Sequence, residues 1–193
     1  VHAWYDDLPQ KALAGRGDWC MAQGVSQTEH FGTWVQYLRA DGSLIPEAMP
    51  SIDVADAPIG APSPDEAKRC STLLYQPIGS VAPSSNFLIS DTDFVEVQTE
   101  IDIQTPIPDP VQTLRSGRHF LFLGCRFAEQ LDRTFARQIM KRSSDRHWAL
   151  LPEPPTKNEA KFLEEQHIER IEMSLSDFTA ALAGMRHDAT EAA

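Results

Sequence analysis

The sequence predicts an α/β fold with a mostly parallel, doubly wound sheet. From residue 71 onward, short apolar segments of strand length alternate with segments whose apolar residues recur at helical spacing. The predicted strands are apolar throughout, which is typical of strands buried on both faces. The chain has 193 residues, of which 41% are hydrophobic, so it can form the core of one ordinary domain.

The first half of the chain is rich in turns, with eleven of the 14 prolines before Val111. Residues 34–39 and 44–45 are predicted to pair as a hairpin, because Asp41-Gly42 tolerates the positive φ of a tight turn. Residues 46–68 contain five prolines and few large apolar side chains, so we expect a Pro-rich surface loop. This half therefore predicts an irregular, turn-rich insertion that contains a hairpin.

The second half is more regular. Its apolar segments predict strands at 72–75, 86–89, 119–123, 148–151 and 168–173. Capping residues and helical spacing predict helices after Ser90-Asp91 and at 111–115, 128–139, 158–167 and 176–185. In parallel sheets ligands lie beyond the carboxyl ends of the strands, so we expect a site in the loops after Trp4, Tyr75, Leu123 and Leu151.

The charge balance disfavours several partners. Asp and Glu number 28 against 17 Lys and Arg, a formal net charge of -11, which argues against binding to nucleic acids or anionic membranes. No apolar run approaches the about 18 residues of a membrane span. The 3 cysteines, Cys20, Cys70 and Cys125, are far apart. They predict reduced thiols, no metal site and a cytoplasmic protein.

Several segments match motifs that one known family has in the same order. Residues 120–126 end a strand in Gly-Cys-Arg where the family has Gly-Tyr-Ser, and residues 147–151 resemble its His-Tyr-Ala-Leu strand. Residues 74–80 stand where the family has Lys-Leu-His-Gly-Ser, and residues 88–94 resemble its Val-Leu-Thr-x-x-Asp-Tyr segment. Residues 1–8 resemble its Thr-Thr-Asn-Tyr-Asp-Asp-Leu segment. Taken together, these motifs resemble the prokaryotic sirtuin-like domain.

This resemblance implies a Rossmann-like domain that holds NAD or ADP-ribose, used in the family for NAD-dependent deacylation or for NAD hydrolysis in antiviral defence. The family pattern carries a cofactor-binding role onto Asp6, Gly79, Ser80, Gly124 and Arg126. Most of the four that match the family, Asp6, Gly79, Ser80 and Gly124, suit the scaffold as well as they suit a ligand. Asp6 and Asp7 suit the start of a helix because of its dipole, and Arg126 can instead form a salt bridge.

The chain departs from the family pattern at the reactive positions. Trp4 stands in place of an Asn that positions water or ribose, and Ile78 in place of a His that acts as a base. The Gly-rich phosphate loop and the first strand that precede the Asn segment in the family are missing. We therefore expect residues 1–193 to form a single sirtuin-like domain that is the later part of a longer fold.

Three functions remain open. The first is a catalytically inactive sirtuin-like module that senses a nucleotide or binds a protein. The second is an active NAD hydrolase or NAD-dependent deacylase, whose catalytic Asn and His lie elsewhere. The third is a structural subunit that docks on a larger assembly. A protein partner or homo-oligomer is expected in each case.

Overall fold

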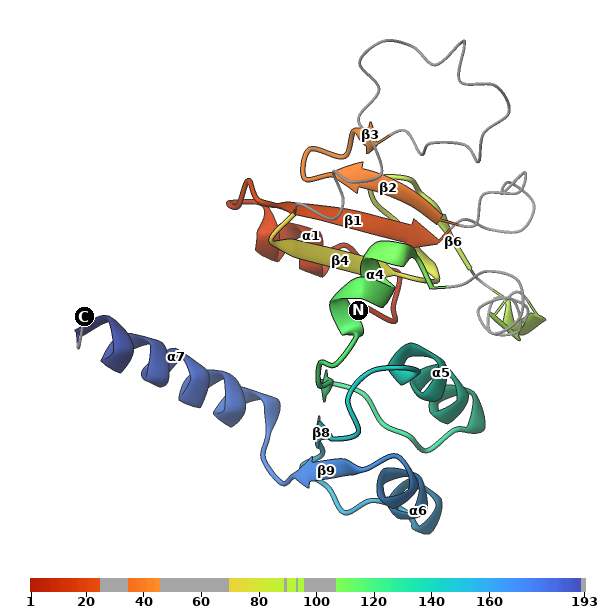
Figure 1. The fold of residues 1–193 in the computed structure, drawn as a ribbon, viewed down its shortest axis with the longest axis vertical. Coiled ribbons are helices and arrows are strands. Elements are labelled where there is room, and N and C mark those ends of the chain that lie inside the picture. Colours follow the sequence, from red (N-terminus) through yellow and green to blue (C-terminus); the bar gives the residue numbers. More distant parts are fainter. Residues whose placement is uncertain (25–34, 46–69, 89, 93, 96–106, 192–193) are drawn as a thin grey trace. The chain divides into compact units, whose positions relative to one another are not determined.

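The computed structural model describes residues 1–24, 35–45, 70–88, 90–92, 94–95 and 107–191 (Figure 1). The chain divides into two compact units, Val1–Thr113 and Leu114–Ala193. The predicted Pro-rich loop at 46–68 lies outside the described residues. A single domain over the whole chain stays a prediction.

The first unit contains a four-stranded sheet with the order β3-β2-β1-β4. The sheet pairs β1 with β2 and β2 with β3 in antiparallel fashion, and β1 with β4 in parallel. The strands are β1 (Trp19–Gly24), β2 (Val35–Arg39), β3 (Leu44–Ile45) and β4 (Thr72–Gln76). Trp19, Met21, Leu38 and Leu74 form its buried core.

The predicted hairpin is confirmed by the β2–β3 pair, in which Tyr37 faces Ile45. Gly42 has φ +82°, the left-handed conformation that the turn requires. The Asp41 carboxylate accepts a 2.8 Å hydrogen bond from the amide of Ser43, which closes the loop locally. Local turn chemistry is therefore sufficient to predict this element.

Strand β1 was not predicted, although all six of its residues are buried. Its sequence contains Ala, Gln and Gly and no β-branched residue, so its intrinsic strand propensity is weak. The strand forms because it lies between β2 and β4 and has a hydrogen-bonding partner on each side. Tertiary pairing overrides propensity at this position.

The N-terminal segment has no regular secondary structure before α1 (Leu8–Leu13), so the strand end implied by the expected loop after Trp4 is wrong. It nevertheless follows the neighbouring chain closely. The amide of His2 donates to the carbonyl of Tyr75 over 2.8 Å, and the amide of Val81 donates to the carbonyl of Tyr5 over 2.8 Å. These bonds attach the segment to β4 and to the short antiparallel pair of β5 (Gly79–Ser80) and β6 (Asn86–Phe87).

After β6, residues 91, 92, 94 and 95 are helical, and the amide of Phe94 donates to the carbonyl of Ser90. The helix predicted to begin at Ser90-Asp91 is therefore present in its described residues. The next element, α4 (Asp109–Arg115), matches the predicted short helix and ends before Gly117, where φ is +66°.

The second unit contains the parallel sheet β7-β8-β9, with a helix between each pair of successive strands (Figure 1). Its elements follow the predicted strand-helix alternation closely. They are β7 (Leu121–Phe122), α5 (Gln130–Met140), β8 (His147–Leu150), α6 (Lys157–Glu165), β9 (Ile168–Ile171) and α7 (Leu175–Glu191).

Both crossover helices pack on the same face of this sheet. Met140 of α5 and Phe162 of α6 belong to one buried cluster with Ala149 of β8, and Phe122 packs against that cluster. On the other face, Leu121 is 44% exposed. The expectation that every strand is buried on both sides is therefore wrong for β7, because within this unit α5 and α6 cover only one face.

The fold class is confirmed as α/β at the level of mixed helices and strands. The described strands form three sheets and include both parallel and antiparallel pairs. Within the described part of the chain, no helix combines the length and the apolar character needed to cross a membrane.

Candidate functional site

Three of the five predicted cofactor-binding residues lie in the first unit, and hydrogen bonds connect two of them, Asp6 and Ser80, to one polar cluster. The main-chain carbonyl of Asp6 accepts a hydrogen bond from the side chain of Gln76 over 3.3 Å. Ser80 is fully buried, and its hydroxyl oxygen accepts from the side chain of Gln10 over 3.1 Å. Gly79 directly precedes Ser80 in β5. The structure therefore joins Asp6 to Ser80 through glutamine side chains.

That polar cluster consists of Gln10, Gln23, Gln76, Ser80 and Ser84, and we call it the glutamine network. The Oε1 atom of Gln76 accepts hydrogen bonds from Gln10 and Gln23, both over 2.8 Å. The hydroxyl of Ser84 donates to Gln23 over 2.8 Å. Gln23 and Gln76 are both fully buried. Hydrogen bonds among side chains buried to this depth hold the ends of the strands in one arrangement.

The glutamine network was missed by the sequence analysis, although a signal was available. Gln23 and Gln76 are polar residues near the carboxyl ends of β1 and β4, and they lie opposite each other in the parallel register. Ligands of α/β proteins lie at such strand ends. A polar residue in an otherwise buried strand indicates either a hydrogen-bond partner or a site.

The carboxylate of Asp6 begins the following helix. Its Oδ1 atom accepts from the amide of Leu8 over 2.8 Å. Asp7 pairs with Lys11 over 2.9 Å, one turn further along. These contacts agree with the alternative interpretation, in which acidic residues stabilise a helix start. The side chain of Asp6 is still 33% exposed, so it remains accessible to a ligand.

Gly79 has a structural requirement of its own. Its φ is +81°, and a Cβ atom at this position would lie 2.1 Å from the carbonyl oxygen of Asn86. Only glycine allows the two strands β5 and β6 to approach this closely. The backbone explains Gly79 without reference to a ligand, and its cofactor-binding role stays a prediction.

The two departures from the family pattern have different surroundings. Ile78 is 6% exposed and packs against Leu88, with Tyr5 and Phe94 beside them. Trp4 is 55% exposed. Its ring stacks on that of Tyr5 with a centroid distance of 4.6 Å. Neither side chain can accept a proton as a general base does.

His2 lies two residues before Trp4, and the sequence analysis did not single it out. Its Nε2 atom lies 3.5 Å from Oδ2 of Asp6, and its side chain is 19% exposed. Burial lowers the pKa of His2 more than Asp6 raises it. A neutral imidazole beside a carboxylate is the arrangement of a general base, so His2 belongs among the candidate residues.

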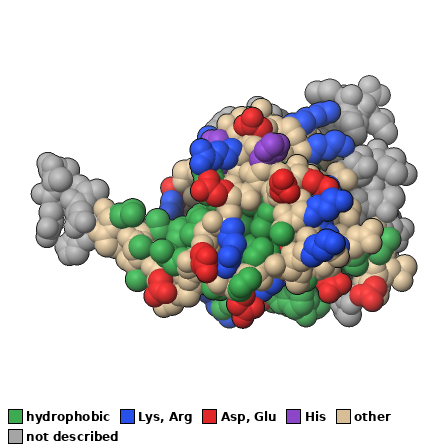
Figure 2. Space-filling view, turned by 90° about the horizontal axis from the view of Figure 1, so that it is seen from below, with side chains coloured by type: hydrophobic (Ala, Val, Ile, Leu, Met, Phe, Trp, Pro, Cys, Tyr) green, Lys and Arg blue, Asp and Glu red, His purple; other side chains and the backbone are tan. Residues whose placement is uncertain are grey.

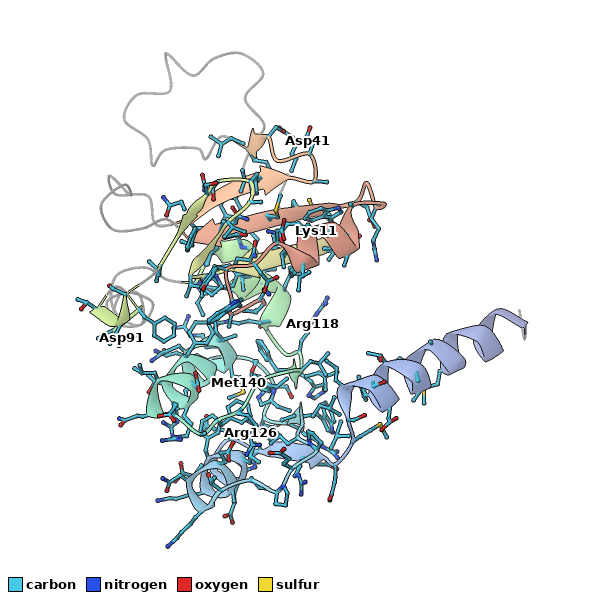
Figure 3. The ribbon with its side chains drawn as sticks, turned by 180° about the vertical axis from the view of Figure 1, so that it is seen from behind. Lys11, Asp41, Asp91, Arg118, Arg126 and Met140 are labelled. Carbon is cyan, nitrogen blue, oxygen red and sulfur yellow. The ribbon has the colours of Figure 1, made fainter. Side chains whose placement is uncertain are left out.

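Gly124 and Arg126 lie in the second unit, after β7. Arg126, labelled in Figure 3, forms two hydrogen bonds with Glu159 of α6, of 2.9 Å and 3.0 Å, and one of 3.0 Å with Glu153. These contacts agree with the salt-bridge alternative for Arg126. The side chain is 39% exposed. Its pairing with a carboxylate shows the bidentate geometry with which arginine also binds phosphate.

Glu159 is also held by contacts with other residues. It is fully buried and forms a capping box with Thr156, and its Oε1 atom accepts from the amide of Phe127 over 3.3 Å. The hydrogen bonds from Arg126 lower the pKa of Glu159 to about 2. Glu159 therefore connects the loop after β7 to the start of α6 as a permanent anion at neutral pH.

Gly124 and Cys125, which directly precede Arg126, have simple environments. Gly124 has φ +66°, and a Cβ atom there would meet open space. The positive φ alone thus explains why glycine occupies this position. Burial raises the pKa of Cys125 to about 11, so this thiol is protonated near neutral pH and is a poor nucleophile. None of the three cysteines is in a disulfide bond.

Ser143 and His147 resemble a nucleophile and a base, but their hydrogen bonds are unsuited to that role. The Nδ1 atom of buried His147 accepts from the amide of Phe120 over 3.0 Å. The proton of a neutral ring is then on Nε2, 3.5 Å from the Ser143 hydroxyl, so His147 cannot remove the serine proton. His147 instead holds the start of β7 against β8.

The first unit also has a shallow cavity of about 440 Å³ between the hairpin and the loop before β6. It contains none of the predicted cofactor-binding residues. It is lined by Gln36, Leu38, Gly42, Leu44, Pro83, Ser84 and Asn86. Among the described residues, no group of three or more metal-ligating side chains is found.

Comparison with protein families agrees with the order of motifs in the sequence. The family model described as SIR2-like domain matches residues 1–171. No curated protein and no solved structure matches the chain. The family match includes every predicted cofactor-binding residue and extends through β9, so the chain belongs to the SIR2-like domain family.

Proposed function

We propose that this protein is a divergent SIR2-like domain that binds NAD or ADP-ribose without cleaving it. The family is NAD-related, and Asp6, Gly79, Ser80, Gly124 and Arg126 are the proposed cofactor-binding residues. The finer expectation of a Rossmann-like, doubly wound sheet is part of this proposal. The parallel pairs β1–β4 and β7–β8–β9 and the crossover helices α5 and α6 support the Rossmann-like part of this expectation, and helices on both faces of the sheet stay a prediction.

The observation that carries the proposal is the environment of Ile78. The resemblance expects a histidine here that removes a proton from a ribose hydroxyl so that nicotinamide can leave. The position is instead occupied by a buried alkyl side chain in an apolar cluster with Leu88. An alkyl group cannot transfer a proton, so the domain lacks the family's base at the family's position.

Incubation of the protein with NAD, followed by detection of free nicotinamide, tests the loss of catalysis. We expect no turnover above the rate without protein. Turnover that is abolished by His2→Ala would overturn this part of the proposal, because His2 beside Asp6 is then the base of an active NAD hydrolase or deacylase. Leu8→Ala, an exposed change on the same segment, is the matched control.

Calorimetric titration with ADP-ribose tests binding. We expect Arg126→Ala to weaken binding, since a guanidinium can pair with the diphosphate. Glu153→Gln is the matched variant, because it removes an exposed partner of Arg126 and leaves the Glu159 pair in place. Glu153→Gln should bind at least as tightly as the wild type. Absence of any binding to the wild-type protein would contradict the proposal.

A second candidate function, a protein-interaction module, is supported by α7. Leu175, Leu182 and Met185 are 47%, 46% and 67% exposed, and with Phe178 they follow the 3-4-3 spacing of a coiled-coil seam. Figure 2 shows hydrophobic side chains along the arm at the left that leads to the undescribed C-terminal residues. We propose that this stripe pairs with the same stripe of a second copy.

Light scattering coupled to size-exclusion chromatography tests this pairing. The wild-type protein should have the mass of a dimer, and Leu182→Glu should have the mass of a monomer, because a buried charge at the seam is unfavourable. Thr179→Glu, outside the 3-4-3 stripe of the same helix, should remain a dimer. A monomeric wild-type protein would rule out the pairing.

A further inference from the structure

Three aromatic rings form a continuous stack in the first unit. Trp4 stacks on Tyr5 with a centroid distance of 4.6 Å and an interplanar angle of 25°. Tyr5 in turn stacks on Phe87 of β6, with a centroid distance of 5.0 Å and an angle of 20°. We call Trp4, Tyr5 and Phe87 the aromatic stack.

The inner part of the stack is held firmly. Tyr5 packs against the buried pair Ile78 and Leu88. Its carbonyl accepts the amide of Val81 over 2.8 Å. Phe87 is fixed by the pairing of β6 with β5, where it faces Gly79. The two inner rings are therefore positioned by the main chain and by the apolar cluster beneath them.

Trp4 is the outer ring of the stack. One face of its indole lies on Tyr5, while the residue as a whole is 55% exposed. The largest aromatic side chain thus has a supported face and an accessible one. An indole held in this way offers a flat apolar surface on which a second planar ring can stack.

We propose that the accessible face of Trp4 is a stacking site for the heteroaromatic ring of a nucleotide. This inference rests on the proposed function and assigns one of its contacts. At the position where the family has a reactive Asn, this chain then has a binding surface, which is the face of the Trp4 ring. Stacking is tolerant of ring identity, because every base has a π face.

The surroundings of Trp4 favour a nucleoside end over a phosphate. Asp6 lies two residues further along, and its partly exposed carboxylate can accept hydrogen bonds from ribose hydroxyls. A carboxylate repels phosphate at neutral pH. The ligand chemistry is therefore a planar nitrogen heterocycle on ribose, which both the adenine and the nicotinamide halves of NAD provide.

Titration with AMP and with nicotinamide mononucleotide distinguishes these two halves. The readout is tryptophan fluorescence of the wild type and of Trp4→Phe, whose difference isolates Trp4 from the other three tryptophans. At least one nucleotide should quench the Trp4 contribution. Ribose 5-phosphate, which has no ring, should leave it unchanged.

Affinities from calorimetry complete the test. Trp4→Ala should weaken binding of the quenching nucleotide by about fivefold or more, Trp4→Phe should retain most of it, and Leu8→Ala should match the wild type. If neither mononucleotide quenches Trp4, or if Trp4→Ala binds as tightly as the wild type, the stacking site is wrong. If a mononucleotide binds through Trp4 but NAD and ADP-ribose do not bind, the stacking site stands and the proposed function fails.

Discussion

Glu159 is a single residue on which several elements depend. It is fully buried, yet it is charged because Arg126, Thr156 and the amide of Phe127 all donate to it. A buried carboxylate with this many donors keeps its negative charge in the folded state to low pH. Stability should therefore depend on pH through this residue.

The pKa of Glu159 is about 2 in the folded protein, against an ordinary value of 4.5. Its contribution to stability is complete above pH 4.5 and is lost as the pH falls towards 2. We expect the unfolding free energy of Glu159→Gln, measured in urea, to fall less steeply over this range than that of the wild type. Glu164→Gln, an exposed change on the same helix, should keep the wild-type slope.

His147 should make the stability of the protein depend on pH in a second range, nearer neutrality. Burial is the main cause that lowers its pKa below 6.5, with His119 and His167 adding to the effect and the Ser144 main chain and Asp145 opposing it. The unfolded chain then binds a proton more readily, so stability is complete above pH 6.5 and declines below it.

His147→Asn tests this dependence, because an amide oxygen can still accept from Phe120 but does not titrate. Thermal melts between pH 7.5 and pH 5 should show a smaller loss of Tm for this variant than for the wild type. His167→Asn, at an exposed position with φ +52° that suits asparagine, removes only the smallest of these contributions and should keep most of the wild-type loss of Tm. An equal loss of Tm in wild type and His147→Asn would contradict the assignment.

At the scale of elements, the pairing of β5 with β6 depends on one glycine. In Gly79→Ala the new Cβ atom would meet the carbonyl oxygen of Asn86 at 2.1 Å, at a φ of +81°. We expect a loss of more than about 3 kcal/mol in the free energy of unfolding, from backbone strain and the steric clash together.

Gly117→Ala is the matched control for that change. Gly117 also has a positive φ, +66°, but open space surrounds the position of its Cβ atom. Gly117→Ala should therefore lower the free energy of unfolding by only about 1 kcal/mol, from the strain of a positive φ alone. Equal losses in the two variants, measured by urea unfolding, would show that the close approach of β5 and β6 contributes nothing.

At the scale of the whole molecule, the net charge of -11 determines which charged partners are attracted or repelled at long range. An acidic chain repels the phosphate backbone, since non-specific affinity for DNA comes from neutralising phosphates with Lys and Arg. We expect no change in the anisotropy of a labelled DNA duplex at roughly 10 µM protein, where basic proteins bind. Salt-sensitive binding would indicate a local basic surface that outweighs the total charge.

The sequence by itself determined the elements whose cause is local. The Asp41-Gly42 turn contains its own hydrogen bond and its own positive φ. Thr156 and Glu159 are close enough to cap α6, and Ser174 accepts from the amide of Asp177 at the start of α7. Strand-helix alternation in residues 114–191 follows from hydrophobic period alone.

Only the tertiary structure decided the features that depend on distant segments meeting. Strand β1 exists because β2 and β4 flank it, and the glutamine network forms because Gln23 and Gln76, 53 residues apart, share a register. Arg126 pairs with Glu159 across 33 residues. Leu121 stays exposed because both crossover helices pack on the other face. Local propensity contains no information on which segments become neighbours, and burial, pairing and pKa all follow from those neighbours.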